Sequence, residues 1–365
     1  MAGSNGDDRT SGNGTPGGNG TSGGNGAQEA PATFDEIRQL LRELPGPDLT
    51  SRSAAATRQQ QLTKPRGALG RLEELAEWLA AWQGAHPPRM DRPRVAVFAG
   101  NHGVAARGVS AYPAEVTQQM VQNFVDGGAA INQLCANCDA DLRVYELALD
   151  QPTADFSQGP AMSEDECARA MAYGMLAVEE GFDVMALGEM GIANTTSAAA
   201  ICCALFGGAP SEWIGPGSGV DQAGLSRKAE VVGAALAVHE GQLDDPLEVL
   251  RRLGGLELAA IAGAILACRL ARTPVLLDGF TCTAAAAVLY QMDRHALDHC
   301  TVAHVSAEPG HRRLLQAIEK RALVDLDMRL GEASGAALAI PLLQAAVTCH
   351  AGMATFDEAG VSTPD

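Results

Sequence analysis

The chain has 365 residues, a length that allows one large α/β domain with an accessory subdomain or two ordinary domains. Its net charge of -18 and pI near 4.8 repel a phosphate backbone over the whole surface, which argues against nucleic acid as a partner and requires any bound phosphate to be held locally. Hydrophobic residues make up 46% and aromatic residues only 4%, which favours helices packed on a buried sheet through Ala, Val, Leu and Ile.

The chain begins with a polar, glycine-rich tail. Residues 1–30 are mostly Gly, Asn, Ser and Thr, with repeated Gly-Asn-Gly units, so they have little apolar surface to offset the entropy of ordering. We expect a disordered tail with a linker or solubilising role. Helical spacing follows within residues 31–90 and is carried by Phe34, Ile37, Leu40 and Leu41, and then by Leu72, Leu75, Trp78, Leu79 and Trp82.

From residue 91 to about 330, strand-like and helical segments alternate. The strand-like runs are 95–99, 142–147, 184–187, 275–277 and 301–305. The helical segments lie near 113–137, 163–180, 195–206, 224–240, 246–270, 279–290 and 310–318. This alternation predicts an α/β fold, with right-handed crossovers and a mostly parallel, Rossmann-like sheet flanked by helices.

The last segment, residues 331–365, carries a glutamate turn and an apolar helix at Ala336–Cys349, which we expect to pack with the N-terminal helices as a small helical subdomain. The two most apolar stretches, Leu256–Leu270 and Ala336–Thr348, are too short to span a bilayer, and Pro341 interrupts the second. We therefore expect no transmembrane segment.

Nine cysteines are scattered through apolar segments, and no signal peptide precedes them. This pattern predicts reduced, buried thiols in a cytoplasmic protein. Cys135 and Cys138 form the one pair at metal or redox spacing, but no second pair completes a zinc site, so we interpret their spacing as coincidence.

Polar, glycine-rich loops follow four of the predicted strands. They are Gly100–Gly103, Gly188–Gly191, Asp278–Phe280 and Ser306–His311. Ligands of open parallel sheets bind beyond the carboxyl ends of the strands, and glycine lets backbone approach a ligand closely. These loops therefore predict the binding site.

Two segments have the character of anion sites. Asn194–Ser197 stands at the start of a helix beside Glu189, and free N–H groups and hydroxyls at a helix N-terminus bind anions, although ordinary capping uses one such residue. Gly215–Gly219, with Lys228 as a counter-charge, is a weaker candidate, because a flexible turn explains it equally well.

Other candidates have equally plain structural interpretations. Ser110, Tyr112 and Gln118 flank a helix start and could be surface groups. His102 and His311 each follow a strand, but a lone loop histidine is more often structural than catalytic. From the residues alone, Glu332 is either a helix-start acid favoured by the helix dipole or a catalytic carboxylate.

Seven segments in order resemble the nicotinate-nucleotide:dimethylbenzimidazole phosphoribosyltransferase family, over about residues 34–355. They are Lys64–Leu75, Gly108 through Phe124, Gly127–Asn132, Gly188–Thr196, Asp278–Phe280, Ser306–His311 and Leu330–Ala337. The resemblance implies transfer of ribose 5-phosphate from nicotinate mononucleotide to 5,6-dimethylbenzimidazole, with inversion at C1′, to make α-ribazole phosphate for the lower ligand of cobalamin. It also implies a parallel-sheet domain, a small helical domain from both chain ends, and a homodimer.

The resemblance assigns roles by position. Glu332 matches the general base, which removes the second imidazole proton of the attacking ring, and no metal or redox cofactor is required. The acceptor ring is implied near Ser110, Tyr112, Gln118, Met190 and Leu330. The nucleotide is implied near Glu189, Gly191, Asn194, Thr195, Gly217, Gly219, Lys228 and Ser306.

Three positions depart from the family pattern. Asn101 stands where Asp is usual, and Ala193 and Ala333 stand where Gly is usual. The added methyl groups lie beside the nucleotide loop and the base, so the acceptor could instead be another benzimidazole, a purine or a phenolic ring. The sequence also leaves open whether a partner subunit completes each site.

Two other classes of protein compete with this interpretation. An NAD-dependent oxidoreductase needs a glycine fingerprint after the first strand, which Gly100–Gly103 does not supply. A noncatalytic nucleotide-binding regulator predicts ligand binding that survives the loss of Glu332.

Overall fold

The computed structural model describes residues 33–362, so the predicted disordered tail lies outside the described residues. The strands are β1 (Pro93–Gly100), β2 (Asp141–Leu147), β3 (Val184–Met190), β4 (Val275–Leu277), β5 (Cys300–Val302), β6 (His304–Val305) and β7 (Val324–Asp325). The helices are α1 (Phe34–Arg42), α2 (Leu49–Gln61), α3 (Arg71–Gln83), α4 (Val116–Val125), α5 (Ala130–Cys138), α6 (Glu164–Leu176), α7 (Asn194–Phe206), α8 (Gln222–Val238), α9 (Pro246–Leu253), α10 (Leu256–Leu270), α11 (Phe280–Met292), α12 (Pro309–Ala317), α13 (Ser334–Gly352) and α14 (Phe356–Ala359), with 3-10 turns η1 (Gly103–Arg107) and η2 (Pro210–Glu212).

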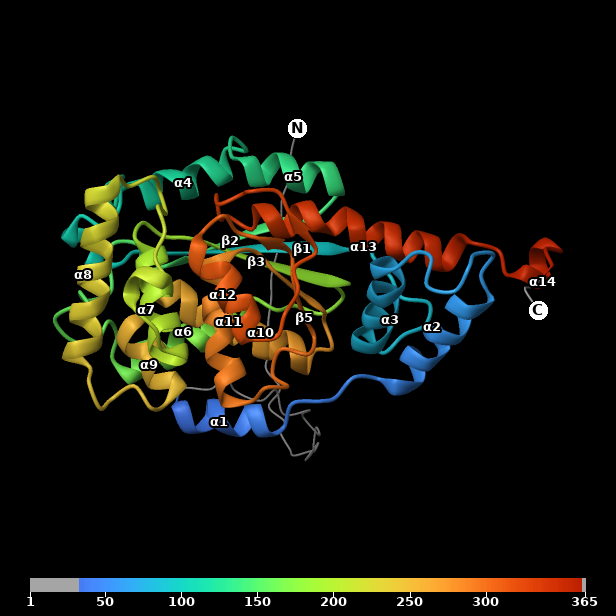
Figure 1. The fold of residues 1–365 in the computed structure, drawn as a ribbon, viewed down its shortest axis with the longest axis horizontal. Helices are drawn as coiled ribbons and strands as arrows, with labels where there is room; N and C mark the ends of the chain where they lie inside the picture. The colour runs from blue at the N-terminus through green and yellow to red at the C-terminus, as the bar shows by residue number, and fades with distance from the viewer. Residues whose placement is uncertain (1–32, 363–365) are drawn as a thin grey trace, which may run out of the picture.

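Five parallel strands form the central sheet in the order β2-β1-β3-β4-β5 (Figure 1). The predicted α/β fold is therefore confirmed. β1 pairs with β2 on one side and with β3 on the other, and Val95 lies between Leu142 and Ala186. Because the strand order reverses between β1 and β3, a ligand crevice is expected at their carboxyl ends.

Helices cover both faces of the sheet, and successive strand residues feed two separate cores. Ala96 and Phe98 of β1 pack into the core that includes α6, α7, α10 and α11, whereas Val95 and Val97 pack into the core that includes α3, α5 and α13. All eight residues of β1 are buried, as expected for a central strand covered on both faces.

Glycines divide two segments that were each predicted as one helix. The segment at 113–137 is α4 and α5, separated at Gly127 and Gly128, and Gly127 has a left-handed φ of 79°. The segment at 246–270 is α9 and α10, separated at Gly254 and Gly255. Similarly, the predicted strand at 301–305 divides at Ala303 into β5 of the main sheet and β6 of a separate two-stranded sheet with β7.

The N-terminal helices do not stay together, which corrects part of the predicted domain division. α2 and α3 pack on each other, and α3 also packs on α13. In Figure 1 both helices lie beside the C-terminal half of α13. α1 instead packs on α6, because Phe34, Ile37 and Leu41 belong to the core of the main domain. The helical subdomain that we propose therefore consists of α2, α3 and the end of α13.

α13 is longer than the apolar run from which it was predicted. It has 19 residues, includes Pro341, and by length and mean hydropathy of 1.3 could cross a membrane. It contacts α3, α5 and the strands β1, β3 and β4, and 44% of its most apolar 18-residue window is buried.

Candidate active site

A cavity of about 690 Å³ lies where β3 and β4 end, next to the reversal of strand order. It brings together most of the predicted site residues: Ser110, Tyr112, Glu189, Met190, Gly191, Asn194, Thr195, Gly217, Ser306, Leu330 and Glu332. Three others do not line it. Gln118 and Gly219 are exposed, and Lys228 is fully buried behind the cavity wall.

Glu332 lies in a tight turn between the cavity and α13. Gly331, Glu332 and Ala333 have φ of 83°, 62° and 62°, a left-handed conformation that costs a residue with a side chain about 1–2 kcal/mol. The turn is held by a hydrogen bond from the Glu332 amide to the carbonyl of Glu189, 3.1 Å, and by one from the Ser334 amide to the carbonyl of Gly331, 3.0 Å. Glu332 is 4% exposed, and burial raises its pKa to about 7. At neutral pH this carboxyl group can therefore both accept and release a proton.

Glu189 is the penultimate residue of β3 and also lines the cavity. Asn194, the first residue of α7, donates its side-chain amide to the Glu189 carboxyl group. Burial, and to a lesser extent the nearby carboxyl groups of Asp278, Glu257 and Glu332, raise the pKa of Glu189 to about 8, although the bond from Asn194 opposes the shift. Glu189 therefore carries a proton near neutral pH and can donate a hydrogen bond into the cavity.

The glycine-rich loop at 215–219 is held by three charged groups, of which Lys228 and Glu308 are buried and Arg329 is exposed. The Lys228 ammonium donates to Thr195 Oγ1, 3.0 Å, and to the carbonyl of Gly215, 2.8 Å. The amide of Gly217 donates to Glu308 Oε1, 2.7 Å, and Arg329 donates to the carbonyl of Gly217, 2.6 Å. Lys228 thus supports the loop from behind, and burial lowers its pKa.

The cavity mouth is more apolar and more exposed. Tyr112 and Leu330 are each 55% exposed, and Met190, Val116 and Met120 also line the wall. Ser110 Oγ lies 2.8 Å from Ser218 Oγ, which joins the segment before α4 to the glycine-rich loop. One end of the cavity thus suits a flat apolar ring and the other a polar group.

Sequence reasoning missed several cavity residues. They are Val109, Val116, Met120, Ile192, Ala193, Ser218, Gly279, Phe280, Thr281, His304, Glu308, Arg329 and Gly331. Several lie within the loops after strands that were identified as a group, so taking every residue of those loops as a candidate would have found them. Glu308 matters most, because its Oε2 is buried and has no hydrogen-bond partner among the described residues.

The two histidines considered as alternative bases do not line the cavity. His102 Nε2 lies 2.5 Å from Glu257 Oε1, and both side chains are completely buried. His311 Nδ1 accepts from the amide of Ser306, 2.8 Å, and burial lowers its pKa to about 3. Both are therefore structural groups in this fold, and neither is a candidate base.

The cysteines do not form a reactive or metal-binding site among the described residues. All nine cysteines are free, burial raises the pKa of the Cys135 thiol to about 12, and within residues 33–362 no three His, Cys, Asp or Glu side chains are placed to hold a metal.

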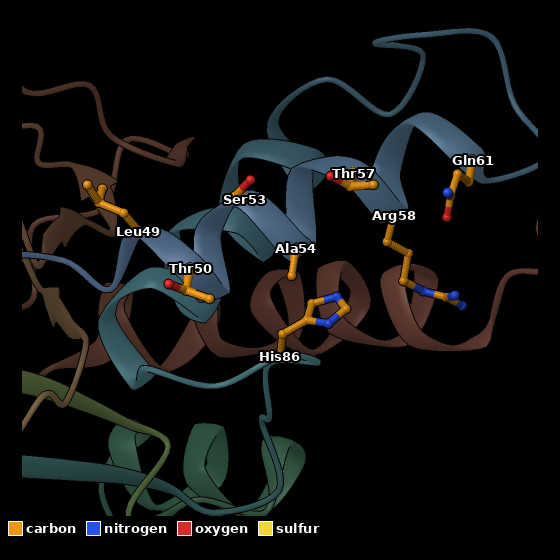
Figure 2. A pocket seen from close by; sticks show the side chains of 8 residues that line it. All are labelled: Leu49, Thr50, Ser53, Ala54, Thr57, Arg58, Gln61 and His86. Atoms are coloured by element: carbon orange, nitrogen blue, oxygen red, sulfur yellow. The ribbon is translucent and has the colours of Figure 1, made fainter.

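A cavity of about 670 Å³ lies along α2 near His86 (Figure 2). Arg58, which lines this cavity, donates hydrogen bonds to the carbonyls of His350, Ala351 and Met353 at the end of α13. Its guanidinium group therefore joins α2 to α13.

Comparison with known proteins agrees with this geometry. A family model described as "Phosphoribosyltransferase" matches residues 44–361. The nicotinate-nucleotide–dimethylbenzimidazole phosphoribosyltransferase of Brucella anthropi is 55% identical over 329 residues, 90% of this chain and 97% of that protein, and that of Rhizobium meliloti is 56% identical over 332 residues, 91% and 98%. The crystal structure of the enzyme of the same name from Thermus thermophilus superposes with a TM-score of 0.79 at 45% identity, covering 87% of this chain and 100% of that one. The chain therefore belongs to the nicotinate-nucleotide–dimethylbenzimidazole phosphoribosyltransferase family.

Proposed function

We propose that this enzyme transfers ribose 5-phosphate from nicotinate mononucleotide to 5,6-dimethylbenzimidazole, giving nicotinate and α-ribazole 5′-phosphate for assembly of the cobalamin nucleotide loop. The observation that carries the proposal is the buried Glu332 carboxylate on the wall of a cavity with one apolar and one polar end. Family membership supports the same reaction, since the relatives that share more than half of its residues carry that name.

The reaction is a displacement at C1′ of the ribose. One imidazole nitrogen of the acceptor attacks C1′ while the bond from C1′ to the pyridinium nitrogen breaks, and the electron pair of that bond leaves with nicotinate. Attack from the face opposite the leaving group converts the β anomer into the α anomer. The pyridinium nitrogen becomes neutral as it departs, so alignment of the two rings contributes most to the rate.

Glu332 removes the proton from the second imidazole nitrogen of the acceptor, which prevents positive charge from remaining on the product ring. The N–H group of the acceptor becomes more acidic as the other ring nitrogen attacks. Burial raises the pKa of Glu332 to about 7, which makes its carboxylate a stronger base for this proton. We assign the acceptor to the apolar end of the cavity, against Met190, Tyr112 and Leu330.

The nucleotide occupies the polar end in this proposal, near Thr195, Gly217 and Ser306. Backbone N–H groups at the start of α7 and the positive charge of Lys228 behind the loop favour a phosphate there. The acidic protein thus binds an anionic substrate through local groups. Glu308 Oε2, which has no hydrogen-bond partner among the described residues, can accept a hydrogen bond from a ribose hydroxyl group.

Chromatographic detection of nicotinate release tests this function. We expect release from nicotinate mononucleotide only when dimethylbenzimidazole is present, together with a ribazole phosphate product. Reduction of NAD without nicotinate release would indicate an oxidoreductase, and nucleotide binding without turnover would indicate a regulator.

A second candidate is the same transfer to another acceptor. Ala193 and Ala333 are buried alanines with φ of 78° and 62°, at positions where the family usually has glycine. A panel of dimethylbenzimidazole, benzimidazole, adenine and phenol, compared by kcat/KM, identifies the preferred acceptor.

Two further expectations belong to this proposal. The resemblance implies a homodimer, which sedimentation of the full chain tests directly. The nine free cysteines suit the reducing cytoplasm, where we propose that the enzyme works.

A further inference from the structure

The helix that follows Glu332 lacks a cap from its own sequence. The residue before α13 is Ala333, whose side chain cannot accept a hydrogen bond, and it has the left-handed φ of 62°. The first amides of a helix need acceptors, particularly where they are buried. Here the acceptor comes from a residue 58 positions away in the chain: Asp278 Oδ1 accepts from the amide of Ala336, 2.9 Å.

Asp278 lies just beyond the C-terminal end of β4, an inner strand of the central sheet, and is not on the cavity surface. It follows β4 directly, is 0% exposed, and does not line the cavity, whereas its neighbours Gly279, Phe280 and Thr281 do. The amides of Ala336, Gly335 and Ala333 favour its ionised form, although burial raises its pKa to about 7. Oδ1 of the carboxyl group therefore bonds the backbone near Glu332, and burial outside the cavity keeps Asp278 from contact with substrate.

The surrounding packing leaves little freedom at this junction. His304 Nε2 lies 3.7 Å from Asp278 Oδ1, and the His304 ring fills the space beside Gly335, where a Cβ atom would overlap it. On the other side of the turn, the amide of Glu332 is bonded to the carbonyl of Glu189 on β3. The turn is thus attached to β3 at Glu332 and to the end of β4 through Asp278.

We propose that Asp278 is a positioning residue for Glu332, holding the start of α13 against the sheet so that the Glu332 carboxylate faces the acceptor ring. The inference rests on the proposed function of Glu332 as the base. A shift of about 1 Å at a reacting group can cost on the order of 100-fold in rate. Loss of the anchor therefore lowers turnover through Glu332 and spares nucleotide binding at the far end of the cavity.

A double-mutant cycle in the full chain tests this coupling. We expect Asp278→Ala to lower kcat by about 10- to 100-fold, with KM for nicotinate mononucleotide within about 3-fold. In the Glu332→Gln background, measured under single-turnover conditions with excess enzyme, the same change should cost less than about 2-fold, because no positioned base remains to be lost. Asp278→Asn keeps an acceptor oxygen and should retain turnover within about 5-fold.

The controls separate positioning from general loss of structure. Asp48→Ala removes the side-chain cap of α2, which accepts from the amide of Ser51 at 2.6 Å, and should leave kcat unchanged. If Asp278→Ala fails to fold, the cycle is run with Asp278→Glu, which keeps the charge but displaces the anchor by one methylene group. The same loss of kcat in both backgrounds, or no loss with normal Glu332, overturns the inference. Near-normal turnover of Glu332→Gln alone instead rejects the proposed base.

Discussion

The amide of Glu332 donates a hydrogen bond to the carbonyl of Glu189, and this 3.1 Å contact places two buried carboxyl groups from different elements on one cavity wall. Burial raises the pKa of Glu332 to about 7 and that of Glu189 to about 8. Neighbouring acids with different pKa values can divide the work of proton acceptor and donor. In the proposed reaction Glu332 serves as the base, while burial of Glu189 favours its protonated form.

Replacing Glu332 by Gln removes the base with little change in shape. We expect kcat to fall by about 10²- to 10⁴-fold, the usual contribution of general base catalysis, while the Kd for nicotinate mononucleotide stays within about 3-fold. Turnover by chromatography and affinity by calorimetry provide the two measurements. Glu230→Gln, at an exposed position of α8, should behave like the unmodified enzyme. Near-normal turnover of Glu332→Gln would point to water or to another cavity group such as His304 or Glu308 as the acceptor of the proton, because His102 and His311 are buried outside the cavity.

The pH dependence of kcat/KM should reveal the same group. The pKa of Glu332 is raised to about 7, and only the ionised form accepts a proton, so kcat/KM should rise as pH increases through about 7 and level off above it. The substrate phosphate also titrates, near pH ~6. The pH profile of kcat/KM for Glu332→Gln serves as the control. This variant should still show the effect of phosphate titration but should lack the rise in kcat/KM near pH 7. A limb near 7 that persists in this variant would assign it to another group.

The inner strands β1, β3 and β4 could be predicted because they are short apolar runs bounded by glycine and polar residues, and burial on both faces requires such runs. The position of the site followed from the same rule, since parallel strands end together. Glu332 itself was ambiguous from sequence, because an acid before an apolar helix has an ordinary explanation in the helix dipole. The left-handed turn is bonded to β3 through the Glu332 amide, and burial raises the pKa of Glu332, two features that depend on distant parts of the chain.

What could not be predicted depends on long-range packing. Asp278 and Ala336 are 58 residues apart, and the local sequence of neither segment predicts the hydrogen bond between them. Lys228 was expected beside the nucleotide, but its ammonium lies behind the loop, bonded to Thr195 and Gly215. Amphipathic spacing identified α1 as a helix without indicating that it would pack on α6. Propensity and spacing define an element, whereas its partner is decided by the whole fold.

Glu308 should influence nucleotide binding through its free oxygen. Glu308→Gln keeps an oxygen for the amide of Gly217 but replaces the unpaired, buried Oε2 with an amide. Loss of a hydrogen bond to a charged group costs about 1.5–3 kcal/mol, so we expect KM for nicotinate mononucleotide to rise about 10- to 100-fold. Steady-state kinetics with varied nucleotide measure this directly, with kcat changing much less. An unchanged KM would place the ribose hydroxyls elsewhere.

Gly188 on β3 should tolerate no side chain, because the turn that carries Glu332 lies directly on it. A Cβ atom there would overlap the backbone nitrogen and Cα of Ala333 as well as its methyl group. We expect Gly188→Ala to displace the turn, lowering kcat by about 100-fold or more, since a shift of about 1 Å at the reacting group is costly. Adding Ala333→Gly should not restore activity, because the overlap with the backbone remains when the methyl group is removed. Gly159→Ala is the matched control, since a Cβ atom there meets nothing within 4 Å, and it should leave turnover and the melting temperature unchanged. Recovery of turnover in the double variant would show that the two methyl groups alone, and not the close approach of the backbone, fix the distance between β3 and the catalytic turn.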